Sequence, residues 1–378
     1  MRTTKIFKEF FKSEKAGGII LIVCTIISLL ITNSTFGENY QHIWHTNFAG
    51  HSIEHWINDG LMTIFFLLIG LELEREIYHG ELSNIKDATL PIFAALGGMI
   101  VPAGLFLLLN FDTETKSGAG IPMATDIAFA LGILSLLGKR VPIGLKIFLT
   151  ALAVIDDLGA ILIIAIFYTK TIVLSNLFLA LSAFIILLIC NKLKIKNLII
   201  YIIGGITMWY FMLNSGVHAT ITGVLLAFTI PFGDGNPKTS SSILQNFLHK
   251  PVAYIILPLF ALANTAIIIN SNIEETLSQN YNIGIALGLI IGKPLGIFLF
   301  SLLALKMGIC KLPNHVNLKS ILGVGFLGGI GFTMSIFITL LAFENETIIN
   351  NAKLMILLSS LVSGMLGYFI LKYITSVH

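Results

Sequence analysis

Residues 143–168 read IGLKIFLTALAVIDDLGAILIIAIFY, and this stretch decides the class of fold. It is long enough to cross a bilayer, because a membrane-spanning helix needs about 20 mostly apolar residues. Two adjacent acids, Asp156 and Asp157, lie in its middle. An ionisable residue at membrane depth costs at least about 2.5 kcal/mol, so it needs a partner or a function. The stretch therefore predicts a membrane helix that carries a functional acid pair.

The composition of the whole chain supports a membrane protein. Of its 378 residues, 56% are hydrophobic and 11% are charged, whereas a soluble domain has about 25% charged residues. So few charges cannot cover a water-facing surface, and we predict an all-α membrane protein. The net charge of +3 comes from dispersed basic residues, which favours signals of membrane topology over nucleic-acid binding.

Windows of about 20 residues predict twelve transmembrane helices within a single domain of residues 1–378. Their bounds are 16–32, 57–78, 90–110, 119–137, 143–168, 173–190, 197–213, 216–230, 251–270, 282–305, 320–343 and 351–373. Nearly all lysines and arginines lie on one side of this layout, which predicts that both termini are cytoplasmic. A cleaved signal peptide is the alternative for the first span, but no small-residue cleavage site stands out after it.

Four charged residues fall deep inside the predicted spans: Asp126, Asp156, Asp157 and Lys293. Asp156 and Asp157 diverge by about 100° around their helix, so they face different neighbours. Two carboxylates in a low dielectric resist ionising together, so one of them is expected to exchange a proton for a cation near neutral pH. A buried lysine has its pKa lowered by desolvation, so Lys293 itself is a second candidate for releasing a proton. The alternative is a static ion pair between Lys293 and one aspartate, which leaves two deep acids without a basic partner.

Other titratable residues carry weaker signals. Glu72, Glu74 and Glu76 lie toward the cytoplasmic end of the second span beside Arg75. They are interpreted either as a solvated helix end or as a funnel that attracts cations. The external loop at 33–56 holds four histidines, interpreted as a solvated surface rather than a metal site: His42, His45, His51 and His55.

Two predicted spans contain helix-weakening residues. GAGIPMATDIAFALG at 118–132 has Pro122 before Asp126, and GVGFLGGIGFTMS at 323–335 holds five glycines. Interrupted spans in two halves of a chain indicate a transporter binding site. We therefore predict discontinuous fourth and eleventh helices, within inverted repeats at about 90–168 and 282–373. The alternative is that the glycines only permit close helix packing.

The broken helices give roles to neighbouring side chains. Thr125 offers a hydroxyl or its backbone carbonyl to a cation. Asp126 and Lys293 offset the partial charges of half-helix ends.

Two other classes of protein use acids in a membrane. An intramembrane aspartyl protease needs two aspartates from different helices, but its Gly-x-Gly-Asp signature is absent from this sequence. A symporter of an organic solute and sodium is favoured by an amide at one position of the acid pair, where this chain has two acids. We therefore expect no enzyme activity, and no organic cofactor, ATP site or nucleic-acid surface.

Seven motifs resemble those of the NhaA family of bacterial sodium/proton antiporters, over about residues 15–373. They are FFLLIGLELERE at 65–76, PMATDIAFALG at 122–132, ALAVIDDLGAI at 151–161, SGVHATITGV at 215–224, YIILPLFALAN at 254–264, GKPLGI at 292–297 and GGIGFTMSIFI at 328–338. This family is itself one in which inverted repeats are known.

The resemblance implies where ions bind. Asp156 and Asp157 match the paired aspartates of the cation and proton site, so they are expected to hold the transported Na⁺ or Li⁺. Lys293 matches the partner of the first aspartate, and Thr125 and Asp126 match the pair at the crossing of the broken helices. No bound cofactor beyond the transported Na⁺ or Li⁺ and H⁺ is expected.

The resemblance also implies regulation by pH. Glu72 and Glu76 match acids of a cytoplasmic funnel tied to pH response, and His218 matches a histidine linked to pH sensitivity. A lone histidine is also common as a satisfied polar residue, so that interpretation of His218 stays open. Where the family often has Leu-Glu-His, this chain has Leu-Gln-Asn at 244–246, which affects the expected pH set-point but not the exchange chemistry.

The expected activity is electrogenic exchange of cytoplasmic sodium or lithium for external protons by alternating access, in a bacterial inner membrane. It would serve sodium and pH homeostasis, and its rate is expected to rise at alkaline pH. The family's external loop carries a small hairpin that helps to form a homodimer, so a hairpin and a homodimer are expected here.

Overall fold

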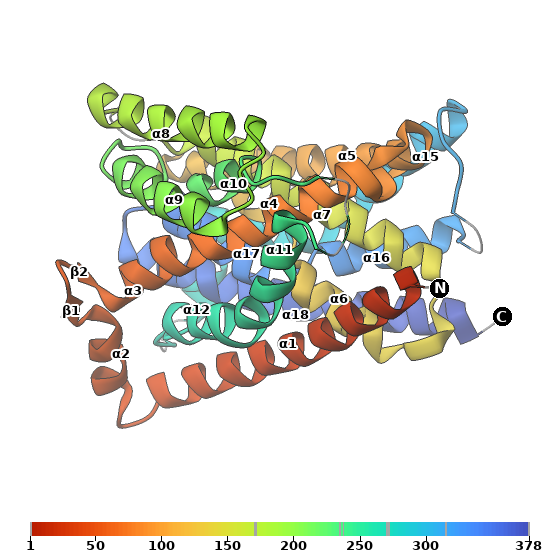
Figure 1. Cartoon of the computed structure of the whole chain (residues 1–378). Coiled ribbons are helices and arrows are strands. Elements are labelled where there is room, and N and C mark those ends of the chain that lie inside the picture. The colour runs from red at the N-terminus through yellow and green to blue at the C-terminus, as the bar shows by residue number, and fades with distance from the viewer. Residues whose placement is uncertain are drawn as a thin grey trace. The chain divides into compact units, whose positions relative to one another are not determined.

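The computed structural model describes residues 2–169, 172–233, 236, 238–269, 273–313 and 316–376, and almost all of their regular structure is helical (Figure 1). The chain divides into two compact units. The first unit comprises residues 1–41, 84–160 and 264–378, and the second comprises residues 42–83 and 161–263.

The first unit contains the long helices on either side of the predicted breaks. Its elements, of which η3 and η4 are 3-10 helices and η6 is a π-helix, are α1 (Arg2–Thr32), α5 (Ile85–Asn110), η3 (Glu114–Met123), α6 (Ile127–Leu136), η4 (Gly138–Arg140), α13 (Ile273–Leu277), α14 (Asn280–Leu287), η6 (Gly288–Gly292), α15 (Lys293–Lys306), α16 (Leu318–Gly328), α17 (Phe332–Ala342) and α18 (Glu346–Ser376). Helix α7 (Ile143–Phe167) belongs to this unit as far as Ala160.

Helices α5 and α15 lie against each other with glycine at the contact (Figure 1). A Cβ atom on Gly97 would collide with the backbone of Gly296, and a Cβ atom on Gly296 would collide with the backbone of Gly97. Small residues let membrane helices approach closely. This close packing fixes Lys293, the first residue of α15, directly after the π-helical turn η6.

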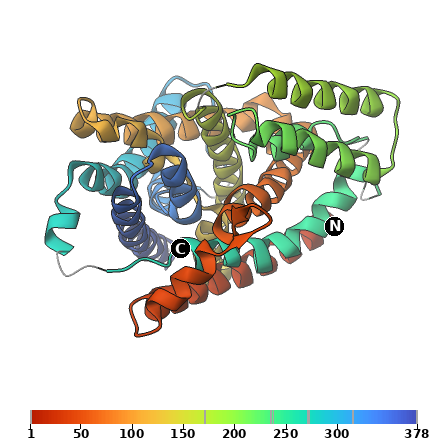
Figure 2. The same cartoon turned by 90° about the vertical axis from the view of Figure 1, so that its left-hand side faces the viewer.

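The second unit combines a small hairpin with shorter helices. Its elements, of which η1 and η5 are π-helices and η2 is a 3-10 helix, are β1 (Asn47–Phe48), β2 (His51–Ser52), α3 (Ile53–His55), η1 (Trp56–Leu61), α4 (Met62–His79), η2 (Glu81–Ser83), α8 (Leu174–Lys192), α9 (Leu198–Leu213), α10 (Ile221–Ala227), α11 (Ser240–Pro251), η5 (Val252–Ile256) and α12 (Leu257–Asn264), whose last residue belongs to the first unit. Helix α2 (Gly37–His45) joins the two units in sequence. Figure 2 shows α8 and α9 side by side.

The loop that the sequence predicts to be external contains a two-stranded antiparallel hairpin, as the resemblance implies. Asn47 pairs with Ser52 and Phe48 pairs with His51. The two turn residues between the strands, Ala49 and Gly50, have φ values of 51° and 93°. Positive φ at both positions is the geometry of a tight hairpin turn whose twist matches the flanking strands.

The lengths and hydropathies of the helices confirm an all-α membrane protein that crosses the bilayer several times. Among the described residues, eight helices are long and apolar enough to span a membrane, and two bent helix pairs raise the number to ten. The helix predicted at 251–270 begins earlier, at Ser240, where the Thr239 hydroxyl accepts a hydrogen bond from Ser242 N at 3.4 Å. The helix continues past Pro251 as the π-helical turn η5, so the proline does not end it.

Candidate functional site

Two helical segments of the first unit are interrupted, and the interruptions contact each other. Helix η3 ends at Met123 and α6 begins at Ile127, while α16 ends at Gly328 and α17 begins at Phe332. The axes of α16 and α17 differ by 49°. The backbone N–H of Asp126 donates to the carbonyl of Ile330 at 2.7 Å, so the two breaks are joined through their backbones.

The carboxylate of Asp126 lies at the N-termini of two half-helices. It accepts a hydrogen bond from Phe129 N at 2.9 Å, which caps α6. It also accepts bonds from Thr333, at 3.2 Å from the backbone N and at 2.5 Å from the hydroxyl, near the start of α17. Helix N-termini carry partial positive charge, so the buried carboxylate offsets that charge at both helices.

Lys293 has the opposite role at the end of η3. Its ammonium group is fully buried, and it donates to the carbonyl of Met123, the last residue of η3, and to Oδ2 of Asp156. A helix C-terminus carries partial negative charge. Lys293 therefore contacts both the partially negative C-terminus of η3 and one carboxylate of the acid pair.

The hydroxyl of Thr125 lies between Asp156 and the end of α16. Thr125 Oγ1 is 2.6 Å from Asp156 Oδ2 and 2.8 Å from the carbonyl of Gly328. A hydroxyl has one hydrogen, so it donates to only one of these acceptors at a time. A protonated Asp156 donates to Thr125, which then donates to Gly328. The same geometry thus accommodates the carboxyl group with or without a proton.

Both members of the acid pair are buried, each with 1% of its surface exposed. Asp156 Oδ1 has no hydrogen-bond partner in the described part of the chain. Asp157 attracts Lys293 electrostatically, but less strongly than Asp156 does. Three buried acids with one buried base leave a negative site, and oxygen atoms are the ligands that hard cations prefer. A site with this net negative charge is able to bind protons or a small cation.

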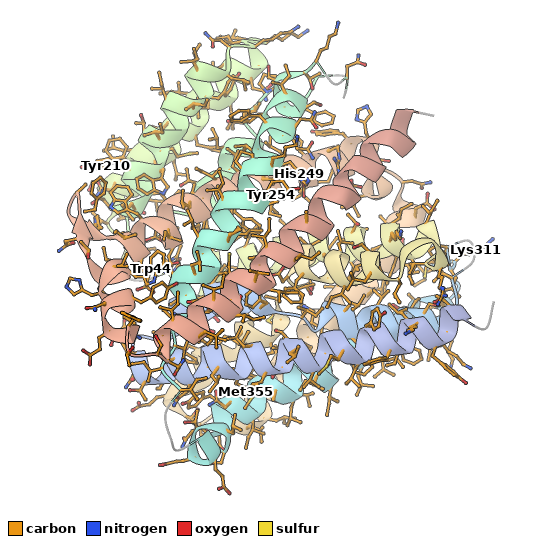
Figure 3. All side chains as sticks on the ribbon, turned by 90° about the horizontal axis from the view of Figure 1, so that it is seen from below. Trp44, Tyr210, His249, Tyr254, Lys311 and Met355 are labelled. Atoms are coloured by element: carbon orange, nitrogen blue, oxygen red, sulfur yellow. The ribbon has the colours of Figure 1, made fainter. Side chains whose placement is uncertain are left out.

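Two of the three acids of α4 are more buried than a solvated helix end allows. Glu72 and Glu74 have 6% and 4% of their surfaces exposed. Glu72 Oε1 lies 3.9 Å from Nδ1 of His249 on α11, which Figure 3 shows beside Tyr254. The Ser241 hydroxyl donates to Glu74 Oε2 at 3.3 Å. These contacts support an internal polar network in the second unit.

Two further predicted site residues, Glu76 and His218, also lie in the second unit. Glu76 pairs with Arg75, with 3.0 Å between Oε1 and Nη2. His218 lies before the start of α10, and its Nε2 is 2.8 Å from the carbonyl of Tyr168. Asp126, Asp156 and Lys293 thus belong to the first unit, whereas Glu72, Glu76 and His218 belong to the second.

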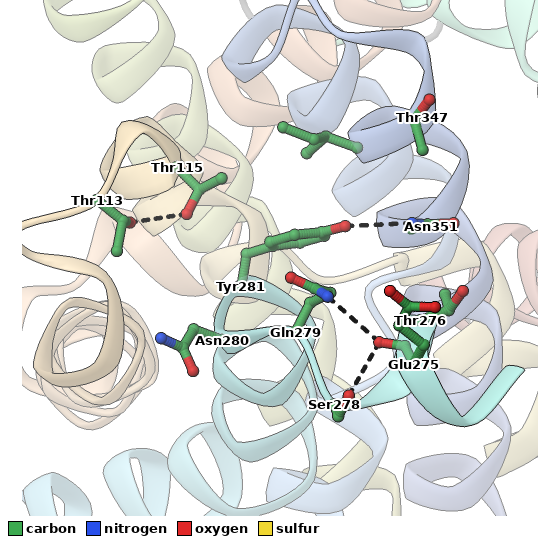
Figure 4. A pocket seen from close by; sticks show the side chains of 11 residues that line it. Thr113, Thr115, Glu275, Thr276, Ser278, Gln279, Asn280, Tyr281, Thr347 and Asn351 are labelled. Carbon is green, nitrogen blue, oxygen red and sulfur yellow. Dashed lines mark hydrogen bonds between the residues drawn. The ribbon is translucent and has the colours of Figure 1, made fainter. Parts of the chain in front are cut away.

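A polar cavity of about 840 Å³ also lies in the first unit. Thr113, Thr115, Gln279, Tyr281 and Asn351 are among the residues that line it, and Asn351 Nδ2 donates to the Tyr281 hydroxyl at 3.3 Å (Figure 4). None of the deep acids lines this cavity. Glu275 also lines the cavity, which is therefore a polar feature separate from the site of the deep acids.

Two partners of the site were missed by the sequence analysis. Thr333 lies within the glycine-rich motif, and it is the first polar side chain after the break, which is a signal that the sequence does offer. The carbonyl of Met123 has no side-chain signal, because every residue carries a backbone carbonyl. Only the path of the backbone brings it to Lys293.

Comparison with known proteins agrees with the motifs. Residues 8–371 match the family described as Na+/H+ antiporter 1. A relative from Flavobacterium psychrophilum, named Na(+)/H(+) antiporter NhaA, is 73% identical over 99% of this chain and 97% of its own length. Relatives from Flavobacterium johnsoniae and Cytophaga hutchinsonii, with NhaA names, are 62% and 59% identical over at least 96% of each chain. The chain therefore belongs to the NhaA family of Na⁺/H⁺ antiporters.

Proposed function

We propose that this protein is an electrogenic antiporter that expels Na⁺ or Li⁺ from the cytoplasm in exchange for external protons. The observation that carries the proposal is the buried cluster of Asp156, Asp157 and Lys293 at the crossing of two interrupted helices. Buried charges of this kind mark ion pathways in membrane proteins.

The exchange follows from competition for the acid pair. A cytoplasmic cation binds Asp156 and Asp157 with help from Thr125, and the cluster of Asp156, Asp157 and Lys293 releases protons in exchange. Lys293 occupies Oδ2 of Asp156, so a cation that binds this carboxylate competes with the ammonium group. The site then opens to the outside, releases the cation and takes up external protons. More protons than cations move in each cycle, which makes the exchange electrogenic.

The proposed topology has twelve spans in a bacterial inner membrane, with both termini in the cytoplasm. To the ten spans counted by length it adds the shorter apolar helix α9 and the segment around α10. The fourth and eleventh spans are discontinuous, at η3–α6 and α16–α17, within inverted repeats at about 90–168 and 282–373. The hairpin of β1 and β2 contributes to a homodimer.

The second unit contains the proposed pH response. Glu72 and Glu76, with His249, form the cytoplasmic network that responds to pH, and His218 contributes at the other end of this unit. Burial of Glu72 beside His249 supports this role, because neighbouring acids and imidazoles in a low dielectric change charge together.

Everted membrane vesicles from a host that lacks its own sodium/proton antiporters test the function. Sodium, lithium or potassium is added after a pH gradient has formed, and a fluorescent probe follows the gradient. We expect sodium and lithium to collapse it with the wild type and not with Asp157→Asn. The matched control is Asp112→Asn, which neutralises an exposed acid and should behave as the wild type. No cation response in well-expressed wild type would contradict the proposal and favour a solute symporter.

A further inference from the structure

The break between α16 and α17 leaves backbone groups that their own helices do not satisfy. A helix leaves its first N–H groups and its last carbonyls without partners, and within a bilayer such groups need partners inside the protein. Two carbonyls of the break meet the segment between η3 and α6. That of Gly328 accepts a hydrogen bond from the Thr125 hydroxyl. That of Ile330 accepts one from the backbone N–H of Asp126.

Two serines of α18 contact the two sides of this break. The Ser360 hydroxyl accepts a hydrogen bond from Phe332 N, at the start of α17, at 3.1 Å. The Ser363 hydroxyl donates to the carbonyl of Phe326, in the last turn of α16, at 2.8 Å. Ser360 and Ser363 are buried, with 4% and 0% of their surfaces exposed. Each serine therefore takes the place that water would have at a free helix end.

The face of α18 that carries these serines is made of small residues. Residues three and four apart share one face of a helix, so Gly364 and Gly367 continue the face that Ser360 begins. A Cβ atom on Gly367 would lie 2.7 Å from Cδ2 and 3.1 Å from the backbone N of Leu327. Small residues let membrane helices approach closely, and here they bring the serines within hydrogen-bonding distance of the broken backbone.

Ser363 also meets the turn that precedes Lys293. Its hydroxyl is 3.5 Å from the carbonyl of Leu289 in the π-helical turn η6. Lys293 N donates to the carbonyl of Gly288, and Pro294 has no N–H to donate. The backbone groups four and five residues after Leu289 are therefore not available to its carbonyl. With one hydrogen, the Ser363 hydroxyl donates either to this carbonyl or to the end of α16.

Ser360 acts on the acid site through the first turn of α17. It holds the N–H of Phe332, and the next residue, Thr333, donates to Asp126 from its backbone N and its hydroxyl. The N-terminus of α17 is thus held between a serine of α18 and a buried carboxylate. Movement of this turn away from α18 would change the contact between Thr333 and Asp126.

Ser363 acts on the acid site through the last turn of α16 and through η6. Helix α16 ends at Gly328, whose carbonyl accepts from the Thr125 hydroxyl at 2.8 Å. The same hydroxyl lies 2.6 Å from Oδ2 of Asp156. Lys293, which follows η6 directly, donates to that same oxygen. One serine of α18 therefore supports the backbone behind two of the partners of Asp156.

We propose that Ser360 and Ser363 are positioning residues for cation binding, which hold both sides of the break and the turn before Lys293 in the arrangement that binds Na⁺ or Li⁺. The inference rests on the proposed function, because that function makes the acid pair the cation site. In the described part of the chain neither serine bonds to a deep acid, and both act through backbone groups. Their loss should therefore weaken cation binding more than it slows the maximal rate of exchange.

Ser359 provides a matched control on the same helix. It is buried, with 1% of its surface exposed, and its hydroxyl has no hydrogen-bond partner in the described part of the chain. Adjacent residues of a helix diverge by about 100°, so Ser359 lies off the face that meets the break. Ser359→Ala thus removes the same atom as Ser360→Ala and Ser363→Ala, from a neighbouring buried position.

The first experiment measures sodium binding without transport. Thermal unfolding of the purified full-length protein is followed over a range of sodium concentrations, with choline as the replacing cation. A ligand that binds the folded state raises its stability, so the rise in Tm gives an apparent Kd. We expect this Kd to increase roughly two- to tenfold in Ser360→Ala and in Ser363→Ala, the range that loss of one hydrogen bond gives. In Ser359→Ala we expect the wild-type value.

Two results of this titration would overturn the inference. An unchanged Kd in Ser360→Ala or Ser363→Ala, even with a lower Tm, would show that the serine supports the fold and not the cation site. An equal increase in all three variants would attribute the effect to the loss of any buried hydroxyl of α18. If one variant fails to fold, the other decides the question, because the two serines hold opposite sides of the break.

The second experiment measures exchange in everted vesicles at one pH over a range of sodium concentrations. We expect Ser360→Ala and Ser363→Ala to raise the apparent KM for sodium and to keep most of the maximal rate. A lower maximal rate with an unchanged KM would contradict a positioning role in cation binding. If wild type neither binds nor exchanges sodium, the proposed function fails. If wild type does both and the two variants match Ser359→Ala, the positioning role alone fails.

Discussion

Thr333 and Asp126 join the two interrupted helices, with 2.5 Å between the Thr333 hydroxyl and Asp126 Oδ2 and 3.2 Å between that oxygen and Thr333 N. Asp126 also caps α6 through Phe129 N. One carboxylate therefore receives hydrogen bonds from the first turns of α6 and α17. Because these donors come from segments far apart in sequence, the contact fixes the relative position of the two half-helices.

Removal of the Thr333 hydroxyl should destabilise the crossing. Thr333→Val keeps the side-chain shape but leaves the buried Asp126 carboxylate without one donor, which costs about 1–3 kcal/mol. We expect a lower Tm in thermal unfolding of the detergent-solubilised protein. Thr333→Ser, which keeps the hydroxyl and loses one methyl group, is the control and should cost about 1 kcal/mol. Equal Tm values for Thr333→Val and wild type would show that this hydrogen bond does not support the crossing.

Substitutions of Lys293 and Asp156 should have non-additive effects on the free energy of unfolding. Removing one partner of a buried pair costs about 3–5 kcal/mol, because the other charge stays buried and uncompensated. We expect Lys293→Gln to lower the Tm, and the double variant Lys293→Gln/Asp156→Asn to recover part of the loss. Unfolding of the two single variants and the double variant completes the cycle. Additive losses would mean that the two groups do not interact in the folded protein.

The residues that form the acid site could be predicted from the sequence, but the contacts between them could not. Asp156, Asp157 and Lys293 stand out, because a charge within an apolar span is rare and costly. Which aspartate meets Lys293 could not be predicted, because it depends on the rotation of α15 about its axis. That rotation is set by the packing of Gly97 against Gly296 and by the π-helical turn before Lys293.

Helix ends and unit boundaries were harder to predict than the presence of helices. The predicted span begins at residue 251, yet the helix starts at Ser240 and runs through Pro251, because a π-helical turn accommodates the proline. The division into two units could not be read from the sequence, because each unit is assembled from separate stretches of the chain.

The glycine contact between α5 and α15 should not tolerate a methyl group. In Gly97→Ala the new Cβ atom would lie 2.7 Å from Cβ of Phe300 and even closer to the backbone of Gly296, an overpacking that costs about 1–3 kcal/mol. We expect a lower Tm and a weaker apparent affinity for sodium, because α15 carries Lys293. Gly104→Ala on the same helix meets no atom within 4 Å, and it should stabilise α5 by roughly 0.5–1 kcal/mol. Equal Tm values for Gly97→Ala and Gly104→Ala would show that Gly97 is not required for the close packing of α5 and α15.

Gln245 should set the pH at which the cytoplasmic network activates transport. Its side chain forms a hydrogen bond with Glu72, and Gln245→Glu would place a second carboxylate there. Two adjacent carboxylates resist ionising together, so the network would lose its protons at a higher pH. If deprotonation activates transport, we expect the pH–activity curve of Gln245→Glu in everted vesicles to move to higher pH.

The control for this shift is the same charge at the next position. Asn246 is exposed, whereas Gln245 is buried, so Asn246→Glu adds a carboxylate that water and salt screen from Glu72. We expect its pH–activity curve to lie close to that of the wild type. A shift of equal size in both variants would attribute the effect to general surface charge. A shift confined to Gln245→Glu would assign the pH set-point to the buried contact between α11 and α4.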